Sequence, residues 1–299
     1  MKRVATIDGL RAVLDAHRAE GRVVGFVPTM GFLHEGHVSL MRAARRDCDV
    51  VVTSIFVNPL QFAVHEDLDD YPRDLEGDAA LAESAGVDLL FVPPVAEMYP
   101  DPVADGLLAT TVSVAGASAG MEGASRPTHF AGVATVVAKL FSIVGPSRAY
   151  FGEKDFQQLA VVRRMVADLS MPVEVIGCET VREADGLAMS SRNAYLSTEQ
   201  RAAAPVVHRA LRAGAAVVLA GERDPSAVRA AIAGVVAQEP LGERDYAEVV
   251  RASDLTVPTT LDPADAPGDL RLLAAVRFGT TRLIDNLGVT APAARTDRS

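Results

Sequence analysis

The stretch VPTMGFLHEGHVSL, residues 27–40, decides the fold predicted for this chain. It places His34 and His37 three residues apart, after a glycine-bearing turn and before an apolar run of helical period. If a strand precedes the turn and a helix follows it, both imidazoles lie on one face of the helix's first turn. Unpaired backbone N–H groups there favour an anion. The stretch therefore predicts a strand–turn–helix unit that can bind phosphate.

Short β-branched runs alternate with amphipathic segments on either side of this unit. The predicted strands cover residues 22–27, 49–56, 87–92, 148–152 and 173–177, and the predicted helices 36–46, 74–85, 129–144 and 155–168. This alternation indicates an α/β fold, with a parallel sheet covered by helices on both faces. Ligands of such sheets bind beyond the carboxyl ends of the strands, where residues 27–40 would fall.

The alternation of strand-like and helix-like segments ends after about residue 183. Two alanine-rich helical stretches, 198–220 and 224–237, precede two strand-like segments, 245–250 and 270–284. The pattern predicts a larger α/β domain over 1–183 and a smaller α+β domain over 184–287. Residues 288–299 read as a disordered tail.

Composition limits the classes of function. The net charge of -10 argues against broad nucleic-acid binding, which needs a basic surface. Cys48 and Cys178 are too few for a disulfide framework or a thiolate metal site, and the opening MKRVATIDGL lacks the apolar core of a signal peptide. No uncharged apolar stretch reaches the ~20 residues of a membrane span. We therefore expect a cytoplasmic protein with no membrane partner.

The HEGH segment also invites a metal-site interpretation. Zinc proteases place the two histidines of HExxH four residues apart, whereas His34 and His37 are one residue closer and enclose Gly36. The spacing disfavours a metalloprotease. Two polar histidines decorating a helix start remain the alternative to an anion site.

Two further segments carry polar side chains at predicted element ends. In SIFVNPLQF (54–62), Asn58 and Gln61 follow a buried strand; they either serve a turn or present paired amides to a ligand with hydroxyls and a carboxylate. In RPTHFAGVATVVAKLF (126–141), Arg126 and His129 precede an apolar helix; they are either solvated or bind an anion or a partner subunit.

Lysine is scarce in this chain, which has only Lys2, Lys139 and Lys154. The segment YFGEKDFQQL (150–159) places Lys154 between a strand and a helix, followed by Asp155 and Gln158. A surface lysine with a capping aspartate is the plain interpretation. Scarcity and position favour an ammonium that clamps phosphate.

The segment GLAMSSRNAYLS (186–197) lies where the two predicted domains join. Ser190, Ser191 and Arg192 form either a polar hinge or a mobile phosphate-binding loop with hydroxyl donors and a guanidinium fork. The interdomain position favours the loop.

Taken together, the motifs resemble one family. The strand–turn–HxGH–helix arrangement is similar to the signature of the nucleotidyltransferase superfamily. In order and spacing, PTMGFLHEGH, FVNPLQF, EDLDDYPRD, RPTHFAGV, FGEKDFQQL and MSSRNAYLS closely resemble the pantothenate synthetase (pantoate–β-alanine ligase) family. The match runs from about residue 2 to residue 285.

This resemblance implies a fold and a reaction. Family members are homodimers of a Rossmann-like N-terminal domain and a smaller C-terminal lid. They use ATP and Mg²⁺ to convert pantoate to an enzyme-bound pantoyl adenylate with loss of pyrophosphate, and β-alanine then attacks it to give pantothenate and AMP. A lid would sequester the adenylate from water.

The resemblance also implies roles for individual residues. His34 and His37 assist pyrophosphate departure, with His37 as the proton donor, and no side chain is a metal ligand because Mg²⁺ is held mainly by ATP phosphates. The remaining catalytic positions are Lys154, Ser190, Ser191 and Arg192. The ATP-binding positions are Pro28, Thr29, Met30, His37, Gly152, Lys154, Asp155, Met189, Ser190, Ser191 and Arg192. The pantoate-binding positions are Asn58, Gln61 and Gln158, with Arg126 and His129 near pantoate or the dimer contact.

Two positions depart from the family pattern. Phe32 occupies a turn position that usually carries a smaller or polar residue, and Ala63 stands where glycine is common. Both put pocket shape and loop flexibility in question, not the reaction.

Three rival functions stay open. Another nucleotidyltransferase should lack the paired-amide segment, a class I aminoacyl-tRNA synthetase needs a tRNA-binding surface that an acidic chain poorly provides, and a non-catalytic nucleotide-binding protein would bind nucleotide without turnover.

Overall fold

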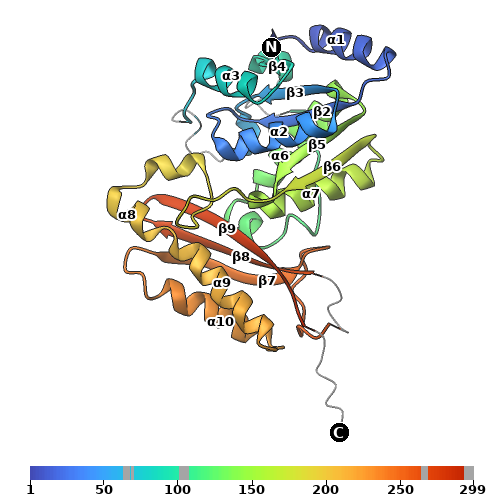
Figure 1. The fold of residues 1–299 in the computed structure, drawn as a ribbon. Helices are drawn as coiled ribbons and strands as arrows, with labels where there is room; N and C mark the ends of the chain where they lie inside the picture. Colours follow the sequence, from blue (N-terminus) through green and yellow to red (C-terminus); the bar gives the residue numbers. More distant parts are fainter. Residues whose placement is uncertain (63–67, 69–70, 101–107, 264–268, 293–299) are drawn as a thin grey trace. The chain divides into compact units, whose positions relative to one another are not determined.

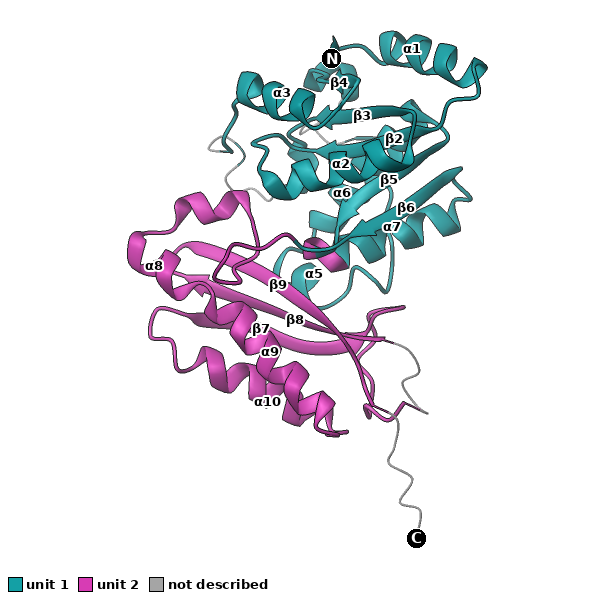
Figure 2. Ribbon diagram, in the orientation of Figure 1, with its two compact units in different colours: residues 1–153, 157–180 teal, residues 154–156, 181–299 magenta. Residues whose placement is uncertain are grey.

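The computed structural model describes residues 1–62, 68, 71–100, 108–263 and 269–292. The described chain divides into two compact units (Figure 2). Unit 1 holds residues 1–153 and 157–180, and unit 2 holds residues 154–156 and 181–299. The chain therefore passes between the units three times. The domain boundary expected after residue 183 stays a prediction.

Unit 1 is built on a parallel six-stranded sheet with the order β1-β4-β3-β2-β5-β6 (Figure 1). Its strands are β1 (Lys2–Val4), β2 (Val24–Thr29), β3 (Val50–Ile55), β4 (Leu89–Phe91), β5 (Ser147–Gly152) and β6 (Val173–Cys178). Every strand but β1 overlaps one predicted from its β-branched run. The apolar run around Val4 is too short to give a periodic signal.

Helices flank this sheet. They are α1 (Ile7–Ala19), α2 (Glu35–Asp47), α3 (Leu75–Ser84), α4 (Val95–Met98), α5 (Met121–Ser125), α6 (His129–Val144) and α7 (Phe156–Asp168). Two short 3-10 turns follow β3 and β5 in the chain, η1 (Pro59–Gln61) and η3 (Glu153–Asp155). Side chains at their starts explain several boundaries. Thr6 caps α1 by accepting from the Gly9 N–H, and Asp74 caps α3 by accepting from the Gly77 N–H.

Neighbouring residues of β2 face opposite layers, as strand geometry requires. Phe26 packs edge-on against Phe141 of α6, with ring centroids 6.3 Å apart. Val27 belongs instead to a buried cluster that includes Val38 and Met41 of α2. The sheet is therefore covered on both faces, and α2 and α6 lie on different ones.

The order of the strands reverses between β2 and β5. From β2 the chain builds outward through β3 and β4, and later through β5 and β6 on the other side. In open parallel sheets this switch point opens a crevice outside the carboxyl ends of the strands. The β2–α2 turn and Gly152 lie at the carboxyl ends of these two central strands.

Unit 2 carries an antiparallel sheet, β7-β8-β9, formed by Glu243–Arg251, Asp269–Phe278 and Thr281–Thr290. The prediction of one strand over 270–284 was wrong, because the run folds back on itself. Phe278 pairs with Thr281, and Gly279 occupies the first position of the two-residue turn with φ of +60°. β9 continues to Thr290, so the beginning of the segment expected to be a disordered tail is strand. Residues 293–299 lie outside the described residues.

Helices α9 (Val206–Leu219) and α10 (Pro225–Val236) pack on this sheet, and their buried residues form one core with it. A single helix predicted over 198–220 is interrupted at Pro205, which separates α9 from α8 (Thr198–Ala203). By length and composition alone, Thr198–Leu219 passes as a membrane-span candidate, but 56% of its most apolar window is buried inside the structure. A buried core helix of a soluble protein passes the same test, so this finding is weak evidence for a membrane.

Candidate active site

The turn between β2 and α2 has a left-handed backbone. Gly31 has φ of +87° and Phe32 has φ of +52°, a region that non-glycine residues rarely adopt. Asp78 of α3 holds the turn, because its carboxylate accepts the Phe32 N–H at 2.8 Å and the Leu33 N–H at 2.6 Å. Burial raises the pKa of Asp78 above its usual value despite these two donors. A left-handed conformation explains why a small or polar residue suits the position of Phe32.

The two histidines that follow form a reciprocal cap at the start of α2. His34 is the N-cap residue, and its Nδ1 accepts the Gly36 N–H at 3.1 Å. The Nδ1 of His37 accepts the His34 N–H at 3.3 Å. A backbone N–H only donates, so Nδ1 is the acceptor in each ring and the proton of the neutral form lies on Nε2. The ring centroids are 4.1 Å apart. The helix start therefore fixes two adjacent imidazoles as Nε2–H donors.

The amides after β3 form a buried network on η1. Asn58 is 1% exposed; its Oδ1 accepts the Tyr99 hydroxyl and the Leu60 N–H, and its Nδ2 donates to Gln61 Oε1 and the Gly132 carbonyl. All four hydrogen-bonding positions of the Asn58 amide are thus engaged. Gln61 also directs Nε2 to the Met30 sulfur at 2.9 Å. The two amides bond to each other, and Asn58 also serves the turn by accepting the Leu60 N–H; their contact with a ligand stays a prediction.

Arg126 and His129 reach the backbone of the same glutamine. Nδ1 of His129 lies 3.1 Å from the Gln61 carbonyl oxygen, and an Arg126 amino group donates to that oxygen at 3.3 Å. The two side chains contact each other at 3.2 Å through His129 Nε2. Since a carbonyl only accepts, His129 donates from Nδ1 and its Nε2 can accept from Arg126. Both residues therefore hold Gln61 in place.

The two glutamines at the start of α7 differ in environment. Gln157 is buried, and its side chain donates to the carbonyls of Ala117, Ala119 and Gly120 while accepting the Glu122 N–H. Through these hydrogen bonds Gln157 holds the loop that precedes α5 in place. Gln158, the predicted substrate residue, is half-buried.

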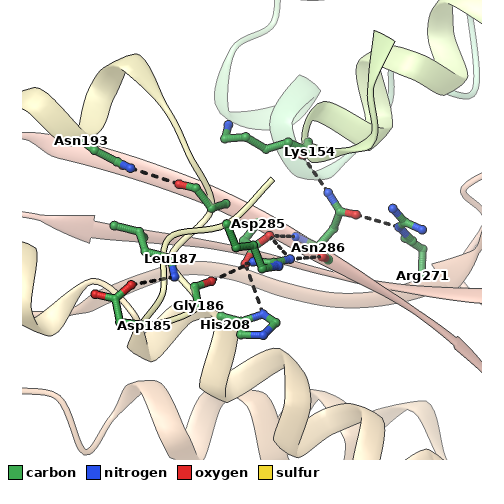
Figure 3. Close-up of polar contacts among 11 residues, drawn as sticks. Lys154, Asp185, Gly186, Leu187, Asn193, His208, Arg271, Asp285 and Asn286 are labelled. Carbon is green, nitrogen blue, oxygen red and sulfur yellow. Dashed lines mark hydrogen bonds and ion pairs between the residues drawn. The ribbon is translucent and has the colours of Figure 1, made fainter. Parts of the chain in front are cut away.

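Lys154 and Asp155 belong to unit 2, where β9 holds their backbone. Asn286 donates from Nδ2 to the Lys154 carbonyl at 2.7 Å and accepts from Arg271 Nε at 2.7 Å (Figure 3). The Arg271 guanidinium lies 4.0 Å from the centroid of the Phe156 ring. Lys154 Nζ is 3.6 Å from Asp155 Oδ1. The segment 154–156 is therefore held at both ends, by Asn286 at the Lys154 carbonyl and by Arg271 at the Phe156 ring.

The loop around η4 (Ser191–Tyr195) is closed by local hydrogen bonds. The Met189 N–H donates to the Val181 carbonyl, and Ser190 Oγ accepts the Arg192 N–H at 3.3 Å. Asn193 donates to the Ala188 carbonyl (Figure 3). Met189, Ser190, Ser191 and Arg192 are all half-buried, so a shaped but accessible loop carries these side chains.

The family model described as Pantoate-beta-alanine ligase matches residues 2–288. The chain belongs to the pantoate-beta-alanine ligase family. Among curated relatives, the pantothenate synthetase of Brucella anthropi is 54% identical over 288 residues, covering 96% of each chain. That of Agrobacterium fabrum is 53% identical over 288 residues, covering 96% of this chain and 95% of its own.

Solved ligases of this family share the fold. The crystal structure of pantothenate synthetase from Thermus thermophilus has a TM-score of 0.87 at 52% identity, covering 96% of this chain and 99% of its own. The pantoate-beta-alanine ligase of Francisella tularensis, crystallised with beta-gamma ATP and β-alanine, has a TM-score of 0.75 at 32% identity, covering 96% and 97%. These matches confirm the predicted family, α/β fold class and enzyme class.

The predicted site residues of this ligase fall into two sets. In unit 1, contacts link Met30, Asn58, Gln61, Arg126 and His129, while His34 and His37 share the α2 start. Lys154, Asp155 and Met189–Arg192 belong to unit 2 and are described by themselves. Ala63, and part of the EDLDDYPRD motif, lie outside the described residues. The binding roles assigned to these residues stay predictions.

Several residues of the site network were not found from the sequence. Their hydrogen-bond partners lie far away in the sequence. The separation is 35 to 46 residues for Asp78, Tyr99 and Gln157, and 132 residues for Asn286. Gln157 lies within the FGEKDFQQL motif, but only its neighbour Gln158 was assigned a role, and none of the quoted motifs includes Asp78, Tyr99 or Asn286. For Asp78 the sequence offered one signal, an aspartate on an otherwise apolar face of the helix predicted over 74–85.

Proposed function

We propose that this chain condenses pantoate with β-alanine to pantothenate, using ATP and passing through pantoyl adenylate. Family membership supports the reaction. The observation in this chain that carries the proposal is the pair of imidazoles held as Nε2–H donors at the start of α2. A carboxylate is a poor acceptor for an amine, so it must first be activated.

In the first step a pantoate carboxylate oxygen attacks the α-phosphorus of ATP, and the bond to the β-phosphate oxygen breaks to release pyrophosphate. Negative charge grows on the leaving oxygens. Donors fixed in advance at a helix N-terminus stabilise that charge without reorganising. His34 and His37 supply these donors as hydrogen bonds from Nε2. The proton-donor role predicted for His37 would require its imidazolium, in which Nδ1 carries a proton and no longer accepts the His34 N–H, because a neutral ring that gave up its Nε2 proton would be left as an imidazolate.

Pantoate is bound at η1 in this proposal. The Gln61 amide and the half-buried Gln158 contact its carboxylate and hydroxyls. Asn58, Arg126 and His129 contribute by holding Gln61, since they contact its side chain or its carbonyl. Direct contact between Asn58 and pantoate would require one of its four hydrogen bonds to exchange.

ATP is bound by residues from both sets. Pro28, Thr29 and Met30 form the turn beside the nucleotide, and Gly152 ends β5 near the adenine or ribose. Lys154 clamps phosphate as a point charge, with Asp155 beside it. Met189, Ser190, Ser191 and Arg192 form the loop that meets the phosphates with hydroxyl, backbone and guanidinium donors.

Mg²⁺ enters as part of the ATP substrate. Within the described ranges, no group of three or more His, Cys, Asp or Glu side chains could hold a metal ion. In this proposal Mg²⁺ is held mainly by the ATP phosphates and by water, and it would offset part of the phosphate charge.

In the second step the β-alanine amine attacks the acyl carbon of the adenylate. The acyl–phosphate bond breaks, AMP leaves, and the amine loses its proton to give pantothenate.

Closure by unit 2 as a lid, assembly as a homodimer and a cytoplasmic location belong to the same proposal.

The test is pantoate-dependent exchange of labelled pyrophosphate into ATP, with Mg²⁺ present and β-alanine absent. We expect exchange, because adenylation is reversible before the amine arrives. Exchange that is independent of pantoate, or supported by another carboxylate in its place, would assign the chain a different nucleotidyl transfer. ATP binding without exchange from folded protein would leave only a nucleotide-binding role.

A further inference from the structure

Tyr99 is a buried hydroxyl that the reaction scheme does not use. It follows α4, is 5% exposed, and its hydroxyl lies 2.8 Å from Asn58 Oδ1. The Asn58 oxygen also accepts the Leu60 N–H. Two donors therefore converge on one amide oxygen, three residues before the predicted substrate glutamine.

Backbone groups fix the direction of the Asn58 amide. The Leu60 N–H can only donate and the Gly132 carbonyl can only accept, at 3.2 Å each. Exchanging oxygen and nitrogen in Asn58 would set donor against donor and acceptor against acceptor. Asn58 therefore has one permitted orientation, and Tyr99 must donate to it.

This orientation passes to Gln61. The second Nδ2 hydrogen of Asn58 points to Gln61 Oε1 at 3.1 Å, so Oε1 faces inward and Nε2 faces away. One Nε2 hydrogen is directed to the Met30 sulfur. Among the described residues the other has no acceptor, and a ligand oxygen can take it. The protein thus presents a donor, not an acceptor, at this position.

We propose that the Tyr99 hydroxyl and Asn58 are positioning groups that fix the polarity of the Gln61 amide, and so make this position selective for an acceptor oxygen such as a carboxylate. The proposal rests on the proposed function, in which Gln61 contacts pantoate. If the Gln61 amide were rotated by 180°, its oxygen would face the substrate in place of its NH₂ group. That oxygen would repel the pantoate carboxylate, so the orientation of the amide decides whether a carboxylate is bound.

The environment keeps Tyr99 a donor. Burial raises the pKa of its phenol, so the hydroxyl stays protonated across the range of an enzyme assay. Its ring packs edge-on against Phe56 with centroids 5.7 Å apart, and the Lys139 ammonium lies 5.9 Å from its centroid. The phenol is therefore held in direction as well as in protonation.

Tyr99→Phe removes only the hydroxyl. We expect the KM for pantoate in pyrophosphate exchange to rise about fivefold, the effect of one neutral hydrogen bond, with kcat and the KM for ATP within about twofold of the unaltered chain. The matched control is Tyr150→Phe. That hydroxyl is also buried and hydrogen-bonded, to Asp47 Oδ2 at 3.0 Å, but lies at another part of unit 1.

Asn58→Asp tests polarity directly. The side chain keeps its shape but loses the donor to Gln61 Oε1, so the Gln61 amide should rotate and present oxygen to the substrate. We expect kcat/KM for pantoate to fall about a hundredfold at pH 8. The loss should shrink, relative to the unaltered chain at each pH, as acid protonates the introduced carboxylate and restores a donor. A merely structural defect would not recover.

Four outcomes decide between the proposals. An unaltered chain without pantoate-dependent exchange refutes the proposed function. With exchange intact, a Tyr99→Phe effect on pantoate no larger than that of Tyr150→Phe overturns the positioning role. Equal losses for ATP and pantoate, or an Asn58→Asp defect that does not change with pH, also overturn it.

Discussion

At the scale of single residues, each histidine of the pair caps α2 and, in the proposed function, also serves the chemistry. Nδ1 of each ring replaces the oxygen of an ordinary N-cap or capping-box residue. Nε2 of the same ring then points its hydrogen away from the helix start. The two functions lie on different atoms, so they can be separated by substitution.

His34→Asn and His34→Gln form a matched pair for this purpose. Asparagine keeps an acceptor at the Nδ1 position and is a good N-cap, so the free energy of unfolding should change by less than about 0.5 kcal/mol. Pyrophosphate exchange should fall about a hundredfold, because one preorganised donor is lost. Glutamine reaches the Nε2 position instead; it should cost about 1 kcal/mol of stability and retain more activity.

Exchange rates and denaturant unfolding curves of the two variants would measure this separation. Equal losses of stability and activity in both would show that His34 acts only as a cap.

At the scale of elements, the close approach of α6 to η1 positions Gln61, the glutamine proposed to bind pantoate. Gly132 of α6 permits it, because a Cβ there would lie 2.2 Å from the Leu60 carbonyl oxygen and 2.7 Å from the Gln61 Cα. The Gly132 carbonyl also orients Asn58. A glycine within a helix would otherwise be unfavourable.

Gly132→Ala should push α6 and η1 apart. We expect a loss of about 1–3 kcal/mol in stability from overpacking and a fall of about tenfold or more in kcat/KM for pantoate. Gly234→Ala in α10 is the control: no atom lies within 4 Å of its added Cβ, so it should gain up to about 1 kcal/mol with unchanged kinetics. Steady-state kinetics and thermal unfolding measure both; wild-type pantoate kinetics in Gly132→Ala would contradict the steric argument.

At the scale of the whole molecule, a buried charge network in unit 2 links stability to pH. Arg182 makes two hydrogen bonds to Asp285, which is 4% exposed. His208 Nδ1 lies 3.8 Å from the same carboxylate (Figure 3). Burial, followed by the charges of Arg182 and Arg212, lowers the pKa of His208, and the charge of Asp285 opposes them.

The sign of the pH dependence follows from this lowered pKa. An unfolded histidine takes up a proton near pH ~6.5, whereas folded His208 resists it until lower pH. Its contribution to stability is therefore full above the unfolded value and is lost as pH falls toward the folded one. We expect Tm to decline less between pH 7 and pH 5 in His208→Gln than in the unaltered chain. Parallel Tm profiles for the two would refute this.

Local pattern predicted the central sheet, because β2 and β3 are mainly apolar runs of consecutive buried residues, and β5 carries a shorter buried run at residues 149–151. It also placed His34, His37, Gln61 and Lys154 at element ends. Local pattern could not reveal that the amides after β3 bond to each other and to Tyr99, because those partners are set by packing of distant segments. The β8–β9 hairpin was missed because its two-residue turn lies within one apolar run.

The three crossings of the chain between units limit how this protein can be recombined with its relatives. A chimera joined at residue 180 would take the segment 154–156 from one parent, and Asn286 and Arg271, which fasten it, from the other. Such a junction would separate residues 154–156 from the rest of unit 2, although unit 2 runs without a break from residue 181 onward. A functional graft must therefore carry residues 154–156 with the C-terminal part, so the two units are not interchangeable modules.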